Sequence, residues 1–326
     1  MIISNLNLIN TLLALIGIIG WGWVWWFSKY KTGCNARVQL GMIALGVVWV
    51  FLFLADTTQD FNPTTLTVVS RALILIGLWC CMPLLKIEDD FMAVIDMQKE
   101  LGVLPDGWWG SKTHKVFLAS GRELDFNWAY LRRKLSSTFT QEQVDGLNYI
   151  LDACNRERLS PQHAAYILAT CWHETAFKMK PIDEIGKGRG KRYGTWFTNS
   201  KGEKYGIRNG AKHKPAYLQS DYNHLYYGRG FPQLTWLDNY IKAGIELGVD
   251  FANNPELASK PEHSADIMVK GSMQGWFTGK SIPDRIKFGT WNEFVSARGV
   301  INGKDRAADI AKYAKIFFTS LDLKRK

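Results

Sequence analysis

Apolar residues are concentrated in the first part of the chain. Three apolar runs, at about residues 6–27, 38–55 and 66–85, contain only one charged residue, Arg71. A helix crosses a bilayer with about 20 apolar residues, so each run is close to the spanning length or above it. A cleaved signal peptide is the alternative for the first run, but no basic residue precedes it and two more runs follow. We therefore expect residues 1–86 to form three transmembrane helices.

The charges between these runs predict an orientation in the membrane. Lys29, Lys31 and Arg37 follow the first run, whereas Asp56 and Asp60 separate the second run from the third. Loops rich in lysine and arginine stay on the cytoplasmic side. The N-terminus is then outside, and residues 87–326 begin in the cytoplasm.

Beyond residue 86, apolar positions recur at helical spacing. This pattern predicts helices at about 91–101, 114–120, 238–248, 262–277 and 305–320. Thr140 followed by Gln143 is a capping box, which starts another helix. Ser160 before Pro161 is typical of an N-cap with proline in the first turn, and it starts a helix that runs toward His173. The expected fold class is therefore mainly α.

The stretch that follows the apolar runs has a motif of its own. Residues 104–113 form a turn-rich sequence with Trp108 and Trp109, between two short predicted helices. This order resembles one half of the small helical peptidoglycan-binding module found beside many wall hydrolases. A spacer whose tryptophans pack on a neighbouring domain is the alternative. We divide the chain into a transmembrane segment (1–86), a module-like segment (87–125), a linker (126–139) and a main domain (140–326).

Composition narrows the classes of function. The chain has 326 residues and a net charge of +10, and only five of its 40 basic residues lie within residues 1–86. Its five cysteines stand at no metal-ligand spacing, which argues against a disulfide framework or a zinc knuckle. We expect neither a metal nor an organic cofactor.

One helix of the main domain carries candidate catalytic residues. His173 and Glu174 resemble the start of a zinc-protease motif, but Phe177 occupies the position where that motif needs a second histidine. Without a zinc site, Glu174 is a carboxylate ten residues before Glu184, and Pro181 breaks the helix between them. Hydrolysis of a glycosidic bond needs such a pair, one acid to protonate the leaving oxygen and one carboxylate to activate water. Solvated surface glutamates are the alternative, and the spacing by itself does not exclude them.

Four ordered sequence blocks extend this pair. They are residues 173–175, 181–184, 228–236 with Asn239, and 297–303. Together they resemble the family 19 glycoside hydrolases, which are chitinase-like enzymes that include many bacteriophage endolysins. The resemblance implies a lysozyme-like α-helical hydrolase domain.

The resemblance also implies roles for single residues. Glu174 would be the general acid and Glu184 the general base of an inverting hydrolysis, and Thr235 would hold the attacking water. Substrate contacts are expected from five side chains: His173, Tyr193, Gln233, Asn239 and Asn302. Asp183 is adjacent to Glu184, so a shift of one residue would exchange the two. We also expect apolar surroundings for Glu174, because it lies on a largely apolar helix.

Two departures from plant-type members of the family bear on the substrate. Ala176 and Phe177 replace a glycine pair that usually follows the His-Glu-Thr block, and the disulfide cysteines of those members are missing. Both departures favour the bacteriophage endolysin branch, whose substrate is peptidoglycan rather than chitin.

A basic stretch indicates an acidic partner. Residues 180–214 contain ten lysines and arginines against three acids, together with Tyr193 and Trp196. Such a run could bind phosphate backbones, but aromatic residues beside glycines suit sugars, so a wall polymer is preferred over nucleic acid. The expected partners are peptidoglycan glycan strands and a lipid membrane, and the apolar segments could support a homo-oligomer.

These observations favour a membrane-anchored peptidoglycan hydrolase that cleaves β-1,4 bonds between amino sugars. The alternatives are a chitinase and a holin-like phage protein that permeabilises a membrane and carries a wall-binding domain. The membrane would be the host inner membrane or an internal viral membrane, as in a virion. The C-terminal domain would then lie on the cytoplasm-derived face.

Overall fold

The computed structural model describes residues 89–210, 216–301 and 305–324. The chain divides into two compact units, Met1–Glu88 and Asp89–Lys326, and every described residue belongs to the second. The three expected transmembrane helices lie outside the described residues. Within the described part, no helix is both long and apolar enough to cross a membrane.

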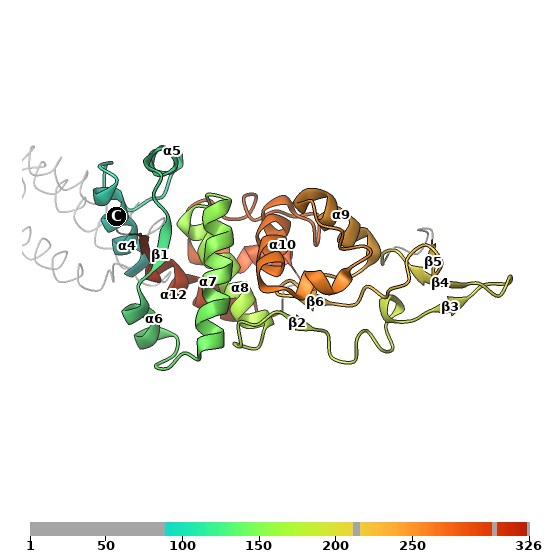
Figure 1. The fold of residues 1–326 in the computed structure, drawn as a ribbon. Coiled ribbons are helices and arrows are strands. Elements are labelled where there is room, and N and C mark those ends of the chain that lie inside the picture. The colour runs from blue at the N-terminus through green and yellow to red at the C-terminus, as the bar shows by residue number, and fades with distance from the viewer. Residues whose placement is uncertain (1–88, 211–215, 302–304, 325–326) are drawn as a thin grey trace, which may run out of the picture. The chain divides into compact units, whose positions relative to one another are not determined.

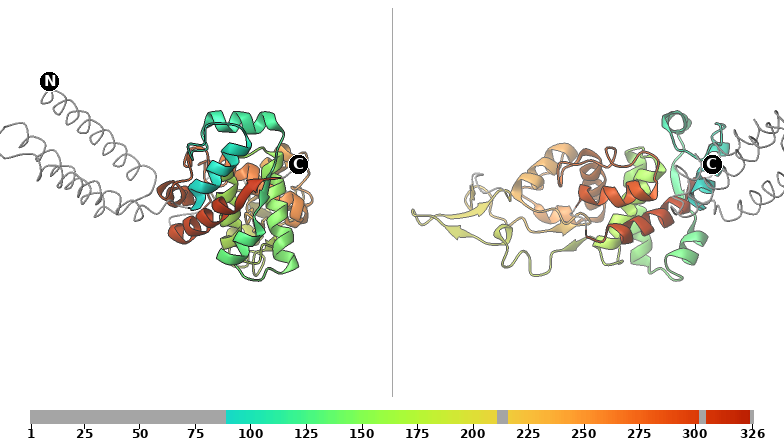
Figure 2. Two further views of the ribbon diagram at one scale, coloured as in Figure 1. Left: turned by 90° about the vertical axis from the view of Figure 1, so that its left-hand side faces the viewer. Right: turned by 180° about the vertical axis from the view of Figure 1, so that it is seen from behind.

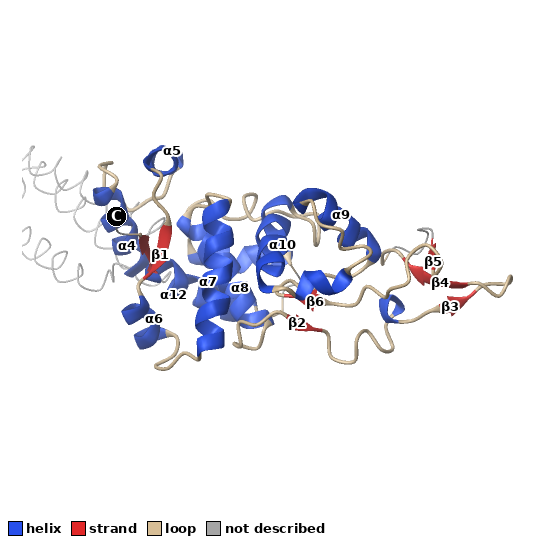
Figure 3. Ribbon diagram, in the orientation of Figure 1, coloured by secondary structure: helices blue, strands red, loops and turns tan. Residues whose placement is uncertain are grey.

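Helices make up most of the regular structure of the second unit (Figure 3). The α-helices are α4 (Asp89–Glu100), α5 (Ser111–Ser120), α6 (Trp128–Lys134), α7 (Gln141–Arg156), α8 (Pro161–Glu174), α9 (Leu237–Leu247), α10 (Pro261–Gln274), α11 (Trp291–Ser296) and α12 (Ala307–Ser320). Three short 3₁₀ helices accompany them: η2 (Arg192–Gly194), η3 (Pro255–Ser259) and η4 (Ala297–Val300). The mainly α fold class is therefore confirmed for this part of the chain.

Local signals fix the beginnings of two central helices. The Thr140 hydroxyl accepts a hydrogen bond from the Gln143 N–H at 3.2 Å, and the Gln143 side chain accepts one from the Thr140 N–H at 2.9 Å. Both arms of the predicted capping box are therefore present at the start of α7. Ser160 and Pro161 begin α8 as predicted, but the Ser160 hydroxyl makes no capping bond and is buried without a partner.

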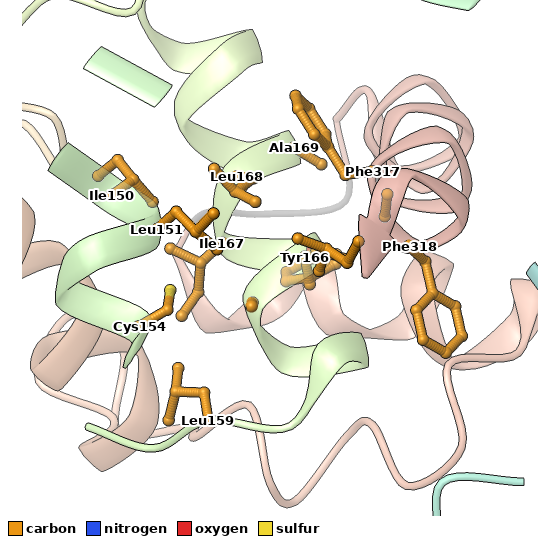
Figure 4. Close-up of a cluster of buried hydrophobic side chains, with 14 of the residues drawn as sticks. Ile150, Leu151, Cys154, Leu159, Tyr166, Ile167, Leu168, Ala169, Phe317 and Phe318 are labelled. Carbon is orange, nitrogen blue, oxygen red and sulfur yellow. The ribbon is translucent and has the colours of Figure 1, made fainter. Parts of the chain in front are cut away.

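Helix α8 forms the centre of the main hydrophobic core. It lies between α7 and α12, and its side chains Tyr166, Ile167 and Leu168 are buried among those of its neighbours (Figure 4). Tyr166 also stacks on Phe294 of α11, with ring centroids 5.9 Å apart. A helix that is apolar on nearly all sides is stable only when it is covered. This packing holds the C-terminal end of α8, and Glu174 with it, in one place.

Residues 89–139 contribute to the same core. Strand β1 (Leu124–Phe126) pairs antiparallel with β7 (Leu321–Leu323). Met97 and Trp109 are buried in the same cluster as the side chains of α8. Helix α6 occupies seven residues of the predicted linker at 126–139, with Leu131 fully buried. Side chains from both parts fill one core, and the division of the chain at residues 125 and 139 stays a prediction. Wall binding by residues 87–125 stays a prediction.

A second, smaller cluster of buried side chains lies around α9. Most of its large members are aromatic: Tyr217, Tyr226, Tyr240, Phe251 and Trp276. Helix α10 joins the two clusters, since Met268 belongs to the first and Ile267 to the second. The described residues therefore form two packed clusters that share α10.

The segment between α8 and α9 contains short strands. Strand β2 (Ile182–Asp183) pairs with β6 (Arg229–Gly230). Between them along the chain, β3 (Phe197–Thr198), β4 (Lys204–Ile207) and β5 (Ala216–Leu218) form a three-stranded antiparallel sheet. This sheet lies beyond α9, at the end of the second unit opposite β1 (Figures 1 and 2). The β2–β6 pair thus holds together the two ends of the long segment that contains β3, β4 and β5.

Candidate active site

Glu174 is the last residue of α8, and its carboxylate contacts a buried arginine. Arg298 Nη1 lies 2.7 Å from Glu174 Oε1, and Arg298 Nε donates to the Asp305 carbonyl oxygen at 2.9 Å. The Arg298 side chain is 4% exposed and that of Glu174 is 24% exposed. A buried charge is costly unless it is compensated. The expectation of apolar surroundings is therefore wrong for the carboxylate, although it holds for the rest of α8.

The loop after Glu174 has an unusual backbone. Ala176, Phe177 and Met179 have positive φ values of 49°, 69° and 51°, a region that glycine adopts far more readily than other residues. The Thr175 hydroxyl holds the loop, because it donates to the Cys171 carbonyl oxygen at 2.8 Å and accepts from the Met179 N–H at 2.9 Å. The two residues that replace a glycine pair thus keep a backbone suited to glycine.

Glu184 follows β2 and is held by a different part of the chain. Its N–H donates to the Gly228 carbonyl oxygen at 2.7 Å, which continues the pairing of β2 with β6. The Tyr193 hydroxyl donates to Glu184 Oε1 at 2.8 Å, and the Gly228 N–H donates to Oε2 at 3.2 Å. Both carboxylate oxygens accept hydrogen bonds, which is the arrangement of an ionised, acceptor-only carboxylate.

Tyr193 is itself fixed by an aromatic neighbour. Its ring meets that of Trp236 edge to face, with centroids 5.0 Å apart. Burial, together with the hydrogen bond to Glu184, raises the pKa of Tyr193 to about 12. The phenol therefore stays protonated near neutral pH and remains a donor. Trp236 has a φ of 73°, and such strain in a non-glycine residue is typical of functional sites.

The neighbouring Asp183 has other partners. Its Oδ1 accepts from the Ser259 hydroxyl at 2.7 Å, and its Oδ2 lies 3.5 Å from the Tyr227 hydroxyl. Successive side chains along a strand point to opposite faces. The two adjacent acids are thus separated, Asp183 toward η3 and Glu184 toward Tyr193.

Gln233 lies beside Glu184. Its Nε2 donates to the carbonyl oxygens of Ile182, at 2.9 Å, and Gly230, at 3.0 Å. A Cβ atom on Gly228 would lie 2.8 Å from Gln233 Oε1 and 3.4 Å from Glu184 Cβ, so the Gln233 and Glu184 side chains both lie close to this glycine. The structure therefore brings together three of the predicted site residues: Glu184, Tyr193 and Gln233.

The other predicted residues are placed as follows. Asn239 Nδ2 donates to the Thr235 carbonyl oxygen at 2.8 Å, which orders the turn that carries the Thr235 hydroxyl. His173 is half-buried in the last turn of α8. Asn302 lies outside the described residues. The roles of these four residues stay predictions.

The described side chains at this site can supply acid–base chemistry. Glu174 and Glu184 come from different elements, and each is held by its own donors. No group of three or more His, Cys, Asp or Glu among the described residues could hold a metal ion. Sequence reasoning includes Arg298 in the block at 297–303 but gives it no role at the site. An arginine between the apolar Phe294 and Val300 is the signal that could have found it, since arginine is rarely buried without a partner.

No protein-family model matches the chain. Parts of it are similar to curated plant enzymes. Acidic endochitinase Q of Nicotiana tabacum is 42% identical over 60 residues, which is 18% of this chain and 22% of that relative. Endochitinase 2 of Gossypium hirsutum is 34% identical over 92 residues, which is 26% of this chain and 30% of that relative. The chain thus matches less than a third of the length of either relative.

Solved structures of bacterial chitinases also align with the chain. Chitinase C from Streptomyces griseus HUT6037 has a TM-score of 0.38 at 20% identity, covering 58% of this chain and 72% of that one. A bacterial family 19 chitinase has a TM-score of 0.35 at 21% identity, covering 58% of this chain and 93% of that one. The sequence similarity is thus local, and the plant relatives that share it are named endochitinases.

Proposed function

We propose that residues 140–326 form an inverting glycoside hydrolase domain that cleaves β-1,4 bonds between the amino sugars of peptidoglycan. The observation that carries this proposal is the pair of carboxylates held from two separate elements. Glu174 ends α8 and is fixed by Arg298, whereas Glu184 follows β2 and is fixed by Tyr193 and Gly228. Inversion requires two such groups on opposite sides of the scissile bond.

Glu174 acts as the general acid. Arg298 contacts only Oε1, and Oε2 has no hydrogen-bond partner among the described residues, so Oε2 can carry the proton toward the glycosidic oxygen. When the proton leaves, the carboxylate becomes negative while Arg298 stays in contact. The guanidinium therefore stabilises the charge that develops as the leaving group departs.

Glu184, rather than Asp183, acts as the general base. Its two donors suit an ionised carboxylate, and Gln233, a predicted sugar contact, packs beside it. Asp183 is instead bonded to Ser259. Glu184 takes the proton from a water that attacks the anomeric carbon. An inverting enzyme leaves about 6.5–9.5 Å between its carboxyl groups for that water, and we assign its positioning to Thr235 and Asn302.

Chitin is the second candidate substrate, and a specific finding favours it. The curated relatives that the chain matches are named endochitinases. Peptidoglycan is preferred because Ala176 and Phe177 stand where plant-type members have a glycine pair. The segment between β2 and β6 is also strongly basic, which suits a polymer that carries acidic groups. Both polymers contain β-1,4-linked amino sugars, so the same pair of carboxylates serves either one.

The test is reducing-end release from purified peptidoglycan and from chitin by the full chain. We expect release from peptidoglycan, and a loss of about 10²–10⁴ in rate for Glu174→Gln, which removes the acid proton. Glu246→Gln is the matched control, because Glu246 is exposed on α9. A Glu174→Gln rate above about a tenth of the wild-type rate would sink the acid assignment. Cleavage of chitin alone would make the second candidate correct.

We further propose that residues 1–86 anchor this domain in a host or viral membrane, as part of an endolysin-type function in a bacteriophage. The support is the three apolar runs and the basic residues after the first. Membrane pellets washed at alkaline pH should retain the full chain. Protease should digest residues 87–326 in inside-out vesicles and spare them in right-side-out ones, whereas the reverse pattern would refute the orientation.

A holin-like protein remains the competing class of function. It would permeabilise a membrane without needing the two carboxylates. Dye leakage from vesicles, measured for the wild-type chain and for Glu174→Gln, separates the two classes. Equal leakage by both chains, without release of reducing ends by either, would favour the holin-like function.

A further inference from the structure

The loop that follows Glu184 carries an unusual concentration of positive charge. We call residues 185–192 the basic loop. Four of its eight residues are exposed cations: Lys187, Arg189, Lys191 and Arg192. Lys201 and Lys204 of the adjoining β3–β4 hairpin are exposed as well. None of the six forms an ion pair with an acid in the described part of the chain. This charge is therefore left for solvent or for a ligand.

The loop is rigidly built. Consecutive turns are closed by backbone bonds from Lys187 N–H to the Glu184 carbonyl oxygen at 2.9 Å, from Arg189 N–H to that of Gly186 at 2.9 Å, and from Lys191 N–H to that of Gly188 at 2.8 Å. Gly188 has a φ of 74°, and a Cβ on Gly194 would lie 2.1 Å from the Gly188 carbonyl oxygen. Glycine is required at both points. A loop backbone that is already ordered binds a ligand at a lower entropic cost.

The loop is attached to the candidate base at both ends. Its first turn is bonded to the Glu184 backbone, and Tyr193, the residue after the loop, donates to the Glu184 carboxylate. Cations that repel one another destabilise a compact loop, and none of these four forms an ion pair with a described acid. A ligand that bears negative charge would offset them, and its position would be beside the bond that Glu184 serves.

We propose that the basic loop binds anionic groups carried on the glycan strand, next to the bond to be cleaved. The inference rests on the proposed hydrolase function and specifies its substrate as a charged glycan. The chemistry it recognises is carboxylate or phosphate, because lysine and arginine bind both as charge-assisted donors. Two sources could supply that chemistry in a bacterial wall: the carboxylates of peptide stems and the phosphates of attached wall polymers. Chitin, a neutral polymer, has neither.

The test compares the wild-type chain with a variant in which Lys187, Arg189 and Lys191 are all replaced by glutamine. The matched control replaces three exposed cations on other elements, Arg285, Lys287 and Lys312, so that the change in net charge is the same. The substrates are peptidoglycan with its wall phosphate polymers, peptidoglycan after acid extraction of those polymers, and soluble neutral chitooligosaccharides. Rates are measured at low and at high salt.

We expect the loop variant to lose about tenfold in kcat/KM on charged glycan at low salt, because steering by local charge is worth about 10–10³ in association rate. The loss should shrink at high salt, as the charges are screened. On neutral oligosaccharides the loop variant and the control should match the wild-type chain. A loss confined to phosphate-bearing glycan assigns the loop to phosphate, and a loss that survives extraction assigns it to peptide carboxylates.

Other results would overturn the inference. An equal loss on neutral and charged substrates would mean that the loop only supports the site structurally, and no loss on any substrate would mean that it is ordinary solvated surface. Competition by single-stranded DNA that exceeds competition by charged glycan would assign the loop to nucleic acid instead.

A binding assay keeps this inference separate from the proposed function. Co-sedimentation with insoluble glycan is measured with Glu174→Gln, with and without the three loop substitutions. Charge-dependent binding by Glu174→Gln, together with no cleavage of any glycan by the wild-type chain, would support the basic loop and refute the hydrolase. Cleavage by the wild-type chain, with glycan binding that the loop substitutions do not change, would support the hydrolase and refute the basic-loop proposal.

Discussion

Glu174→Gln should weaken the fold as well as remove the acid. Glutamine has nearly the shape of glutamate, so the substitution removes the negative charge of the ionised carboxylate and the transferable proton of its acid form. The charge that it leaves behind belongs to Arg298, whose side chain is 4% exposed. The ion pair at the end of α8 therefore predicts a second, measurable consequence of this change.

The size of the effect follows from the contacts of Arg298. Removing one partner of a buried ion pair costs about 3–5 kcal/mol. Two features reduce that cost here. The glutamine Oε1 can still accept from Arg298 Nη1, and Arg298 Nε keeps its bond to the Asp305 carbonyl oxygen at 2.9 Å. The Glu174 side chain is also 24% exposed, so solvent compensates part of the change. We expect the free energy of unfolding to fall by about 1–3 kcal/mol, which includes the loss of a charge-assisted hydrogen bond.

Urea unfolding of the full chain at pH 7 measures this change, with Glu246→Gln as the exposed control. A double-mutant cycle isolates the pair: Arg298→Met, Glu174→Gln and the double variant should show a coupling of about 1–2 kcal/mol, because contacting residues are not additive. Unchanged or increased stability of Glu174→Gln, together with a coupling near zero, would refute the reasoning that Arg298 depends on Glu174.

Three further predictions concern the surroundings of the site and the core. Tyr193→Phe removes the donor to Glu184 at 2.8 Å and should lower kcat about tenfold with KM little changed; an unchanged kcat on soluble glycan fragments would contradict this role. Ala176→Gly relieves a φ of 49° and should raise the free energy of unfolding by about 0.5–1 kcal/mol, whereas a destabilised variant in urea would show that the loop is not strained. Burial lowers the pKa of His163 below its ordinary value of 6.5. The unfolded chain therefore binds more protons there, so stability should fall as pH drops below about 6.5, and less so in His163→Gln. A pH dependence that is the same in both chains would exclude His163 as its source.

The helices could be predicted because their information is local. The capping box at Thr140 and the Ser160-Pro161 start of α8 both act within one turn, and the structure begins each helix there. Helices α6 and α11 have only seven and six residues, too few for an apolar period to stand out. The strands in the basic, glycine-containing stretch have only two to four residues, too few to show the alternation of apolar and polar positions that predicts a strand.

Contacts between distant residues could not be predicted in the same way. Strand β1 pairs with β7 about 200 residues later, which joins residues 89–139 to the main core although the motif at 104–113 suggests a separate module. Glu174 meets Arg298 across 124 positions, and nothing within α8 indicates that partner. The sequence pattern identifies Glu184 only through its block, because Asp183 is chemically equivalent; their separate hydrogen-bond partners distinguish the two.

The central claim is that Glu174 and Glu184 hydrolyse a β-1,4 glycosidic bond with inversion. Proton NMR of a reaction on soluble peptidoglycan fragments, recorded before the products mutarotate, tests it most directly. The account predicts that the first new reducing ends are α-anomers, and that neither Glu174→Gln nor Glu184→Gln produces them. New ends that are β-anomers, or anhydro ends without a reducing group, would contradict the mechanism and require a different use of these two carboxylates.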